Sequence, residues 1–120
     1  MIFVTADSCR AQLERLTQML VSAFPGSTIY RHTDVCHVPH DVLHHKVDAV
    51  LLEAKSDGPD FLSMLRRQKP NVPVFLLAKT ETIREEAERA GANGCFVLPE
   101  GEQQLLDAIR LANSADVVLR

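Results

Sequence analysis

Short apolar runs alternate along this chain with segments whose apolar residues recur at helical spacing. Strands that alternate with helices are typical of βαβ units, in which the strands lie parallel. One run, at residues 47–52, is apolar almost throughout, which predicts a strand covered on both faces. The sequence therefore predicts an α/β fold in one domain over residues 1–120, a doubly wound parallel sheet between two layers of helices. The predicted strands lie at residues 2–5, 28–30, 47–52, 74–77 and 96–97.

Five helices are expected between and after these strands. The first should have residues 7–8 as its N-cap and should stop at the Pro-Gly pair 25–26. A short, weak helix is expected at 40–45, and a third helix should follow the turn at 57–59. The fourth is expected over 80–90, before Gly91. The apolar residues expected to face inward are Leu13, Leu16, Leu20 and Phe24, then Phe61, Leu62 and Leu65, then Ile83, Ala87 and Ala90, and finally Leu105, Leu106, Ile109 and Ala112.

Composition narrows the class of function. A chain of 120 residues buries enough surface to fold without disulfides or a metal. Its net charge of −3 provides no basic surface for nucleic acid. No apolar stretch approaches the roughly 20 residues of a membrane span, and no basic segment precedes the first apolar run, so a signal peptide is not expected.

The three cysteines are Cys9, Cys36 and Cys95, and no two of them form a CxxC motif. We therefore expect buried, reduced thiols in a cytoplasmic protein.

Doubly wound sheets bind ligands at the carboxyl ends of their strands. At these ends the chain places Asp7 after the first strand, Glu53 at the end of the third, Ala78 after the fourth and Leu98 after the fifth. We therefore expect these four residues to converge on one pocket.

Several stretches resemble the receiver domain of response regulators, the CheY-like phosphoacceptor module. Residues 48–53, Asp-Ala-Val-Leu-Leu-Glu, are similar to the family's third strand, which ends in the phosphorylated aspartate. Residues 57–66 resemble its Asp-Gly turn and third helix, and 73–77 resemble its fourth strand. The most specific match is Ala-Gly-Ala-Asn at 90–93 followed by Phe-Val-Leu-Pro at 96–99, similar to the family's Ala-Gly-Ala and Lys-Pro stretch.

The resemblance covers nearly the whole chain. It implies a flavodoxin-like (βα)5 three-layer sandwich with strand order 2-1-3-4-5. It also implies a role in two-component signal transduction, as a phosphorelay module that is not an enzyme.

Five positions depart from the family's pattern. Ala6 stands where one of two paired acids is expected, Glu53 at the phosphoacceptor position, Ala78 in place of Thr or Ser, Leu98 in place of lysine, and Cys95 in place of an aromatic residue. Phosphoryl transfer depends on positioning and on charge neutralisation by a divalent cation and a lysine. The departures predict a degenerate receiver that signals independently of aspartyl phosphorylation.

Glu53 has several interpretations. Its carboxylate can imitate a phosphorylated aspartate, with Lys79 as a substitute cation in the pocket. Alternatively, both Glu53 and Lys79 are solvated side chains at the end of a strand. A further alternative is a receiver still regulated by weak cation or phosphate binding at Asp7 and Glu53, because Mg²⁺ prefers oxygen ligands. No other cofactor is expected.

The histidines of the chain all lie between positions 32 and 45. His40 and His44 are four residues apart, so a helix places them on one face. Imidazole and thiolate are ligands that suit Zn²⁺. A metal site made of Cys36, His37, His40 and His44, or a pH sensor, is therefore an alternative to a solvated patch, although no CxxC or HExxH spacing supports it.

The charged run at 84–89 is expected to be the solvated face of the fourth helix. In receiver domains the fourth helix, fifth strand and fifth helix often form the dimer or partner surface. The resemblance therefore implies a protein partner or a second copy of the chain at this face, with no nucleic acid or membrane as a direct partner.

Overall fold

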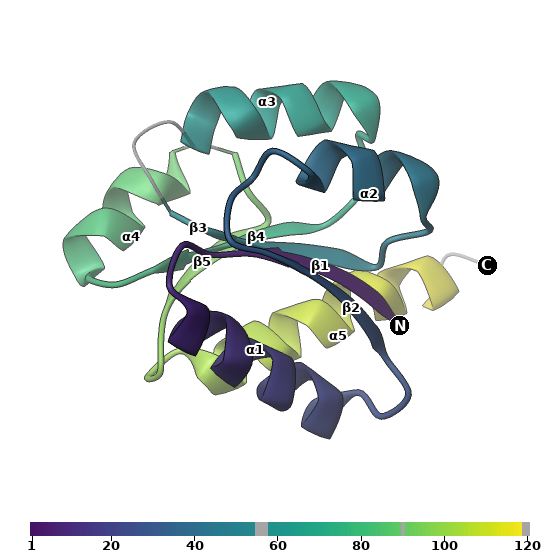
Figure 1. The fold of residues 1–120 in the computed structure, drawn as a ribbon, viewed down its shortest axis with the longest axis horizontal. Helices are drawn as coiled ribbons and strands as arrows, with labels where there is room; N and C mark the ends of the chain where they lie inside the picture. Colours follow the sequence, from purple (N-terminus) through teal and green to yellow (C-terminus); the bar gives the residue numbers. More distant parts are fainter. Residues whose placement is uncertain (55–57, 90, 119–120) are drawn as a thin grey trace.

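Five parallel strands form one sheet in the order β2-β1-β3-β4-β5 (Figure 1). The computed structural model describes residues 1–54, 58–89 and 91–118. The predicted fold class and strand order are confirmed. The strands are β1 (Ile2–Ala6), β2 (Thr28–His32), β3 (Ala49–Glu53), β4 (Val74–Ala78) and β5 (Gly94–Val97).

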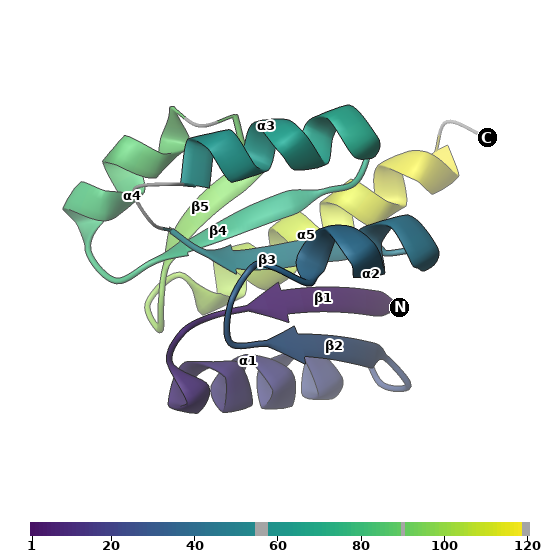
Figure 2. The ribbon, with the colours of Figure 1, turned by 45° about the horizontal axis from the view of Figure 1, so that its top comes forward.

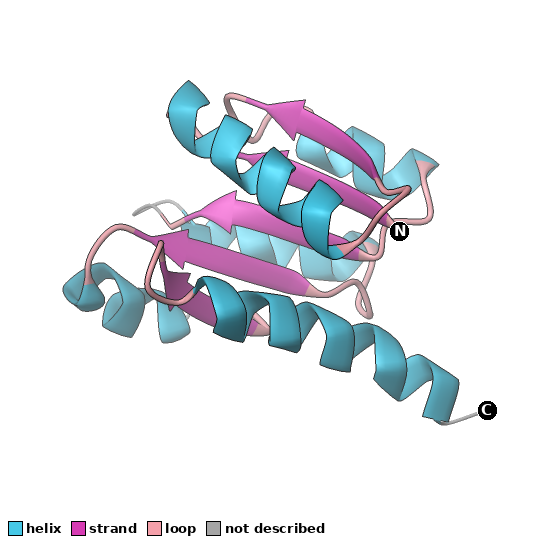
Figure 3. Ribbon diagram, turned by 90° about the horizontal axis from the view of Figure 1, so that it is seen from below, coloured by secondary structure: helices cyan, strands magenta, loops and turns pink. Residues whose placement is uncertain are grey.

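Two layers of helices enclose the sheet. One face is covered by α1 and α5 (Figure 3), and the opposite face by α2, α3 and α4. This arrangement follows from the alternation of side chains along each strand. In β1, for example, Phe3 packs in the core beside α1 and α5, and Val4 packs in the core beside α2 and α3. The helices are α1 (Arg10–Ala23), α2 (Val38–His44), α3 (Gly58–Gln68), α4 (Glu81–Glu88) and α5 (Glu102–Val118).

Three predicted helix ends need correction. The N-cap of α1 is Cys9 and not the pair at 7–8, because the Asp7 carboxylate instead accepts a hydrogen bond from the Cys9 N–H at 2.8 Å. The second helix begins at Val38, where a proline in its first turn fixes helical φ. The fourth was expected over 80–90, but it has Thr80 as its N-cap and ends at Glu88. Asp57 and Ala90 lie outside the described residues.

The cysteines only partly match the expectation of buried thiols. Cys95 is buried, but Cys9 and Cys36 are exposed because they lie in the loops before α1 and α2. All three are free thiols. Over the described ranges, no helix has both the length and the apolar character to cross a membrane.

Candidate functional site

The carboxyl ends of β1, β3 and β4 lie next to one another at one edge of the sheet (Figure 2). The strand register pairs Ala6 with Leu52 and Glu53 with Leu77. Asp7 follows β1, Glu53 is the last residue of β3 and Lys79 follows β4, so the three lie at neighbouring strand ends.

The Glu53 carboxylate is hydrogen-bonded by Ser8 of the β1–α1 loop. Its Oε1 accepts a hydrogen bond from the Ser8 hydroxyl at 2.9 Å and another from the Ser8 N–H at 3.2 Å. The Ser8 Oγ also lies 3.2 Å from Oε2. Only 11% of the Glu53 side chain is exposed, so little of this carboxylate is in contact with solvent. Sequence reasoning assigned Ser8 to the N-cap of the first helix and did not identify it as a partner of Glu53.

Lys79 contributes a weaker interaction. Its Nζ lies 3.9 Å from Glu53 Oε2, and 71% of its side chain is exposed. An exposed ion pair at this distance adds at most about 1 kcal/mol. The predicted pocket cation therefore lies beside Glu53, but it does so from a solvated position at the rim.

Asp7 shapes the loop that carries Ser8. Its side chain is buried, with the residue 4% exposed. Its Oδ1 accepts from the Cys9 N–H, and its own N–H donates to the His32 carbonyl at 3.1 Å. A carboxylate that bonds the backbone two residues further on stabilises a turn. Asp7 therefore helps to hold Ser8 in place against Glu53.

The neighbouring positions are apolar. Ala6 and Ala78 are buried in the core beside α2 and α3. Leu98 packs against the opposite core and lines a small gap with Leu16 and Met19. At the position where the resemblance implied a lysine, this chain thus has a side chain that packs against α1. Neither Ala78 nor Leu98 offers a polar group to a phosphoryl ligand.

Cys95 and Phe96 lie on opposite faces of β5. Cys95 packs in the core beside α3 and α4, and burial raises the pKa of its thiol. Phe96 packs beside α5, with its ring 6.2 Å from that of Phe75. A shallow depression lies beside Cys95 on the surface formed by α4, β5 and α5, and Arg84 and Gln104 line it.

Arg84 is less exposed than the predicted solvated face of α4 would require. It forms ion pairs with Glu81 and Glu88, and its side chain is only 26% exposed. The rest of the run at 84–89 is exposed apart from Ala87, which is half-buried.

The structure separates the histidines into small groups. His32 Nε2 is hydrogen-bonded to the Asp41 carboxylate, and its ring lies 5.7 Å from that of His37. The rings of His40 and His44 are 4.3 Å apart, as their helical spacing predicted. His45 stacks on Tyr30. Asp41 was not predicted, since nothing in the local sequence marks it as a partner of His32.

The proposed metal ligands do not form a complete site. Within residues 1–54, 58–89 and 91–118, no group of three or more His, Cys, Asp or Glu side chains is placed to hold a metal ion. A hydrogen bond with Asp34 raises the pKa of the Cys36 thiol, which opposes formation of the thiolate that Zn²⁺ requires.

Any Zn²⁺ binding is expected to depend on His40 and His44, because they are the two closest imidazoles of the candidate set. Calorimetric titration should show that a His40→Ala, His44→Ala double variant loses whatever binding the parent has. A His45→Ala variant is the control, since that ring stacks on Tyr30. Tight binding that survives in the double variant would place the ligands elsewhere.

No family model and no curated protein sequence matches this chain. Solved structures do match it. The signal receiver domain of an HD domain-containing protein from Pseudomonas fluorescens Pf-5 is 27% identical, with a TM-score of 0.78, over 95% of this chain and 94% of that one. A response regulator receiver domain protein from Clostridium thermocellum is 18% identical, with a TM-score of 0.81, over 99% and 98%. A LuxR family DNA-binding response regulator from Silicibacter pomeroyi is 22% identical, with a TM-score of 0.77, over 96% and 93%. The chain has the fold of response-regulator receiver domains.

Proposed function

We propose that this chain is an atypical receiver domain that acts in signal transduction by binding a protein partner, independently of aspartyl phosphorylation. The observation that carries the proposal is the environment of Glu53. A carboxylate occupies the phosphoacceptor position and is already bonded by Ser8, with Lys79 at its rim. Ala78 and Leu98 replace the hydroxyl and the lysine through which a phosphoryl group would act. In this proposal, Glu53 holds permanently the conformation that phosphorylation would otherwise induce.

The partner surface in this proposal is the face formed by α4, β5 and α5. Glu53 is connected to this face through adjacent backbone. The Ala54 N–H donates to the Leu77 carbonyl at 2.8 Å, and Lys79 precedes Thr80, which caps α4 by accepting from the Ile83 N–H. The shallow depression beside Cys95 lies on the same face, where a partner or a second copy of the chain can dock.

Glu53→Gln tests the proposal because it keeps the shape of the side chain but removes its charge. We expect an intact fold by circular dichroism, with amide NMR shifts that extend into residues 81–88. Coupling of this kind commonly amounts to about 0.5–2 kcal/mol, so self-association or partner binding should change by a factor of roughly 2 to 30. Sedimentation velocity over a concentration series provides the second measurement.

Two variants sharpen this test. Ser8→Ala removes the hydroxyl donor to Glu53 and should shift α4 in the same direction. Glu14→Gln removes an equal charge from α1 and should leave α4 unchanged. If the shifts of Glu53→Gln stay within the neighbours of residue 53 and its sedimentation equals that of the parent, Glu53 is inert and the proposal fails.

The second candidate is a receiver still regulated by a cation at Asp7 and Glu53, which both remain at the strand ends. We expect Mg²⁺ to bind weakly, with a dissociation constant of millimolar or above, because Ala6 removes a carboxylate and Mg²⁺ demands near-octahedral oxygen ligands. Amide shifts of Asp7 and Glu53 during titration measure this affinity. An Ala6→Asp variant should bind more tightly. Saturation of the parent below millimolar Mg²⁺ would favour the second candidate.

We do not propose an enzymatic activity. The sequence contains no Gly-rich phosphate loop and no nucleophile elbow. The fold by itself does not determine function. The proposal of a non-enzymatic role therefore rests on the residues around Glu53 and not on the fold.

A further inference from the structure

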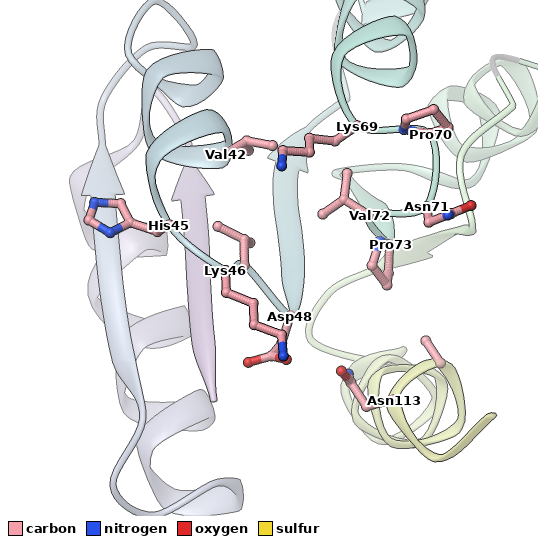
Figure 4. A pocket seen from close by; sticks show the side chains of 12 residues that line it. Val42, His45, Lys46, Asp48, Lys69, Pro70, Asn71, Val72, Pro73 and Asn113 are labelled. Carbon is pink, nitrogen blue, oxygen red and sulfur yellow. The ribbon is translucent and has the colours of Figure 1, made fainter. Parts of the chain in front are cut away.

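A second pocket opens at the other end of the strands from Glu53, where β3 and β4 begin (Figure 4). It has a volume of about 320 Å³ and is formed by the end of α2, the α2–β3 loop, the α3–β4 loop and the last part of α5. Small-molecule sites usually have volumes of roughly 300–1,000 Å³. The pocket is therefore large enough for a ligand the size of a single substituted ring.

Part of its lining is apolar. Val42 and Val72 are buried residues of the core beside α2 and α3, and Val47 and Pro73 extend the same surface. Val42 and Val72 are already only 1% and 8% exposed, so an apolar body placed here would remove the half-buried Val47 and Pro73 from water. Burial of apolar surface is the main source of affinity for such ligands.

Two lysines line the pocket. Lys46 belongs to the α2–β3 loop and Lys69 to the α3–β4 loop, and Figure 4 shows the Lys69 side chain extending across the pocket toward α2. In the described part of the chain, neither lysine forms an ion pair. An anion between them would gain attraction from both ammonium groups.

The other charged and titratable side chains of the pocket already have structural roles. Asp48 Oδ2 accepts a hydrogen bond from the Ile2 N–H at 2.8 Å, which joins the starts of β1 and β3. His45 stacks on Tyr30, with its Nδ1 3.4 Å from the Tyr30 hydroxyl. With two lysines and one aspartate, the lining carries a net charge of +1 when His45 is neutral.

We propose that this pocket binds a small organic anion, a carboxylate attached to an apolar body of about one ring. The carboxylate lies between the Lys46 and Lys69 ammonium groups, and the apolar body lies against Val47 and Pro73. This proposal does not depend on the role of Glu53, because the two sites are at opposite ends of the strands.

Amide NMR titration of the whole chain with benzoate, at constant ionic strength, tests this proposal. Benzoate should cause saturable shifts at Lys46, Asp48, Lys69 and Val72. Benzyl alcohol, which lacks the charge, and inorganic phosphate, which lacks the apolar body, should each bind at least about tenfold more weakly. A Lys46→Gln, Lys69→Gln double variant should also lose roughly tenfold in benzoate affinity, about threefold for each exposed lysine.

The control is an Arg15→Gln, Arg89→Gln double variant, which removes the same charge from exposed positions outside the pocket. Its benzoate affinity should stay within about twofold of the parent value. If benzyl alcohol binds as tightly as benzoate, the lysines do not recognise the charge. If phosphate binds as tightly as benzoate, the apolar contact is not needed. If benzoate causes no saturable shifts, the proposed site does not exist.

Discussion

Treatment with acetyl phosphate and Mg²⁺ is expected to leave this chain without a phosphoryl group. Stabilisation of the transferring group requires a bound cation and a positioned lysine, and the chain has Ala6 and Leu98 at the corresponding positions. Glu53 also places its oxygens about one methylene further from the strand than aspartate would. A misplacement of about 1 Å can reduce a rate on the order of 10²-fold. Intact-mass measurement after the reaction provides the readout.

A Glu53→Asp variant extends this prediction. It corrects the side-chain length but leaves Ala6, Ala78 and Leu98 unchanged, so it too should remain unmodified. A receiver domain that carries the full set of acidic, hydroxyl and lysine residues, treated in parallel, shows that the donor is active. A stoichiometric mass gain located at Glu53 in the parent chain would contradict phosphorylation-independent function.

Phe75→Ala is expected to destabilise the fold by about 3–5 kcal/mol. Phe75 lies on β4 and is 1% exposed, in the core between the sheet and the α1–α5 layer. Domains of this size are stable by roughly 5–15 kcal/mol, so this one substitution should remove a large share of the stability. The chain has no tryptophan and one tyrosine, and urea unfolding is therefore best followed by far-ultraviolet circular dichroism.

Phe61→Ala is the matched control for Phe75→Ala. Phe61 lies on α3 and is only partly buried against the opposite core. It should cost less than half as much, because its removal leaves a site that is already partly open to solvent. Equal losses from both substitutions would show that burial in the β4 core is not the dominant contribution.

The sequence by itself determined the architecture. Five apolar runs separated by helical patterns predict parallel βα units, since the periodicity of a strand or helix is a local property of the chain. The same reasoning located the candidate site, because the carboxyl ends of parallel strands meet at one edge. Glu53, Asp7 and Ala78 were placed at this site in this way, but the expectation that Leu98 joins them was wrong, because its side chain packs against α1 in the opposite core. Helix ends were less accurate, as at Cys9 and Glu88, because terminal turns fray and their limits vary by one or two residues.

Only the tertiary structure decided which side chains meet. The bond from Ser8 to Glu53 joins residues 45 positions apart, and the bond from Ile2 to Asp48 joins residues 46 positions apart. The His32–Asp41 pair depends on how α2 packs beside β2. Such contacts depend on strand register and on the path of loops, which no local pattern encodes. The same holds for the Lys46–Lys69 pocket, whose walls come from segments that become neighbours only when the sheet has formed.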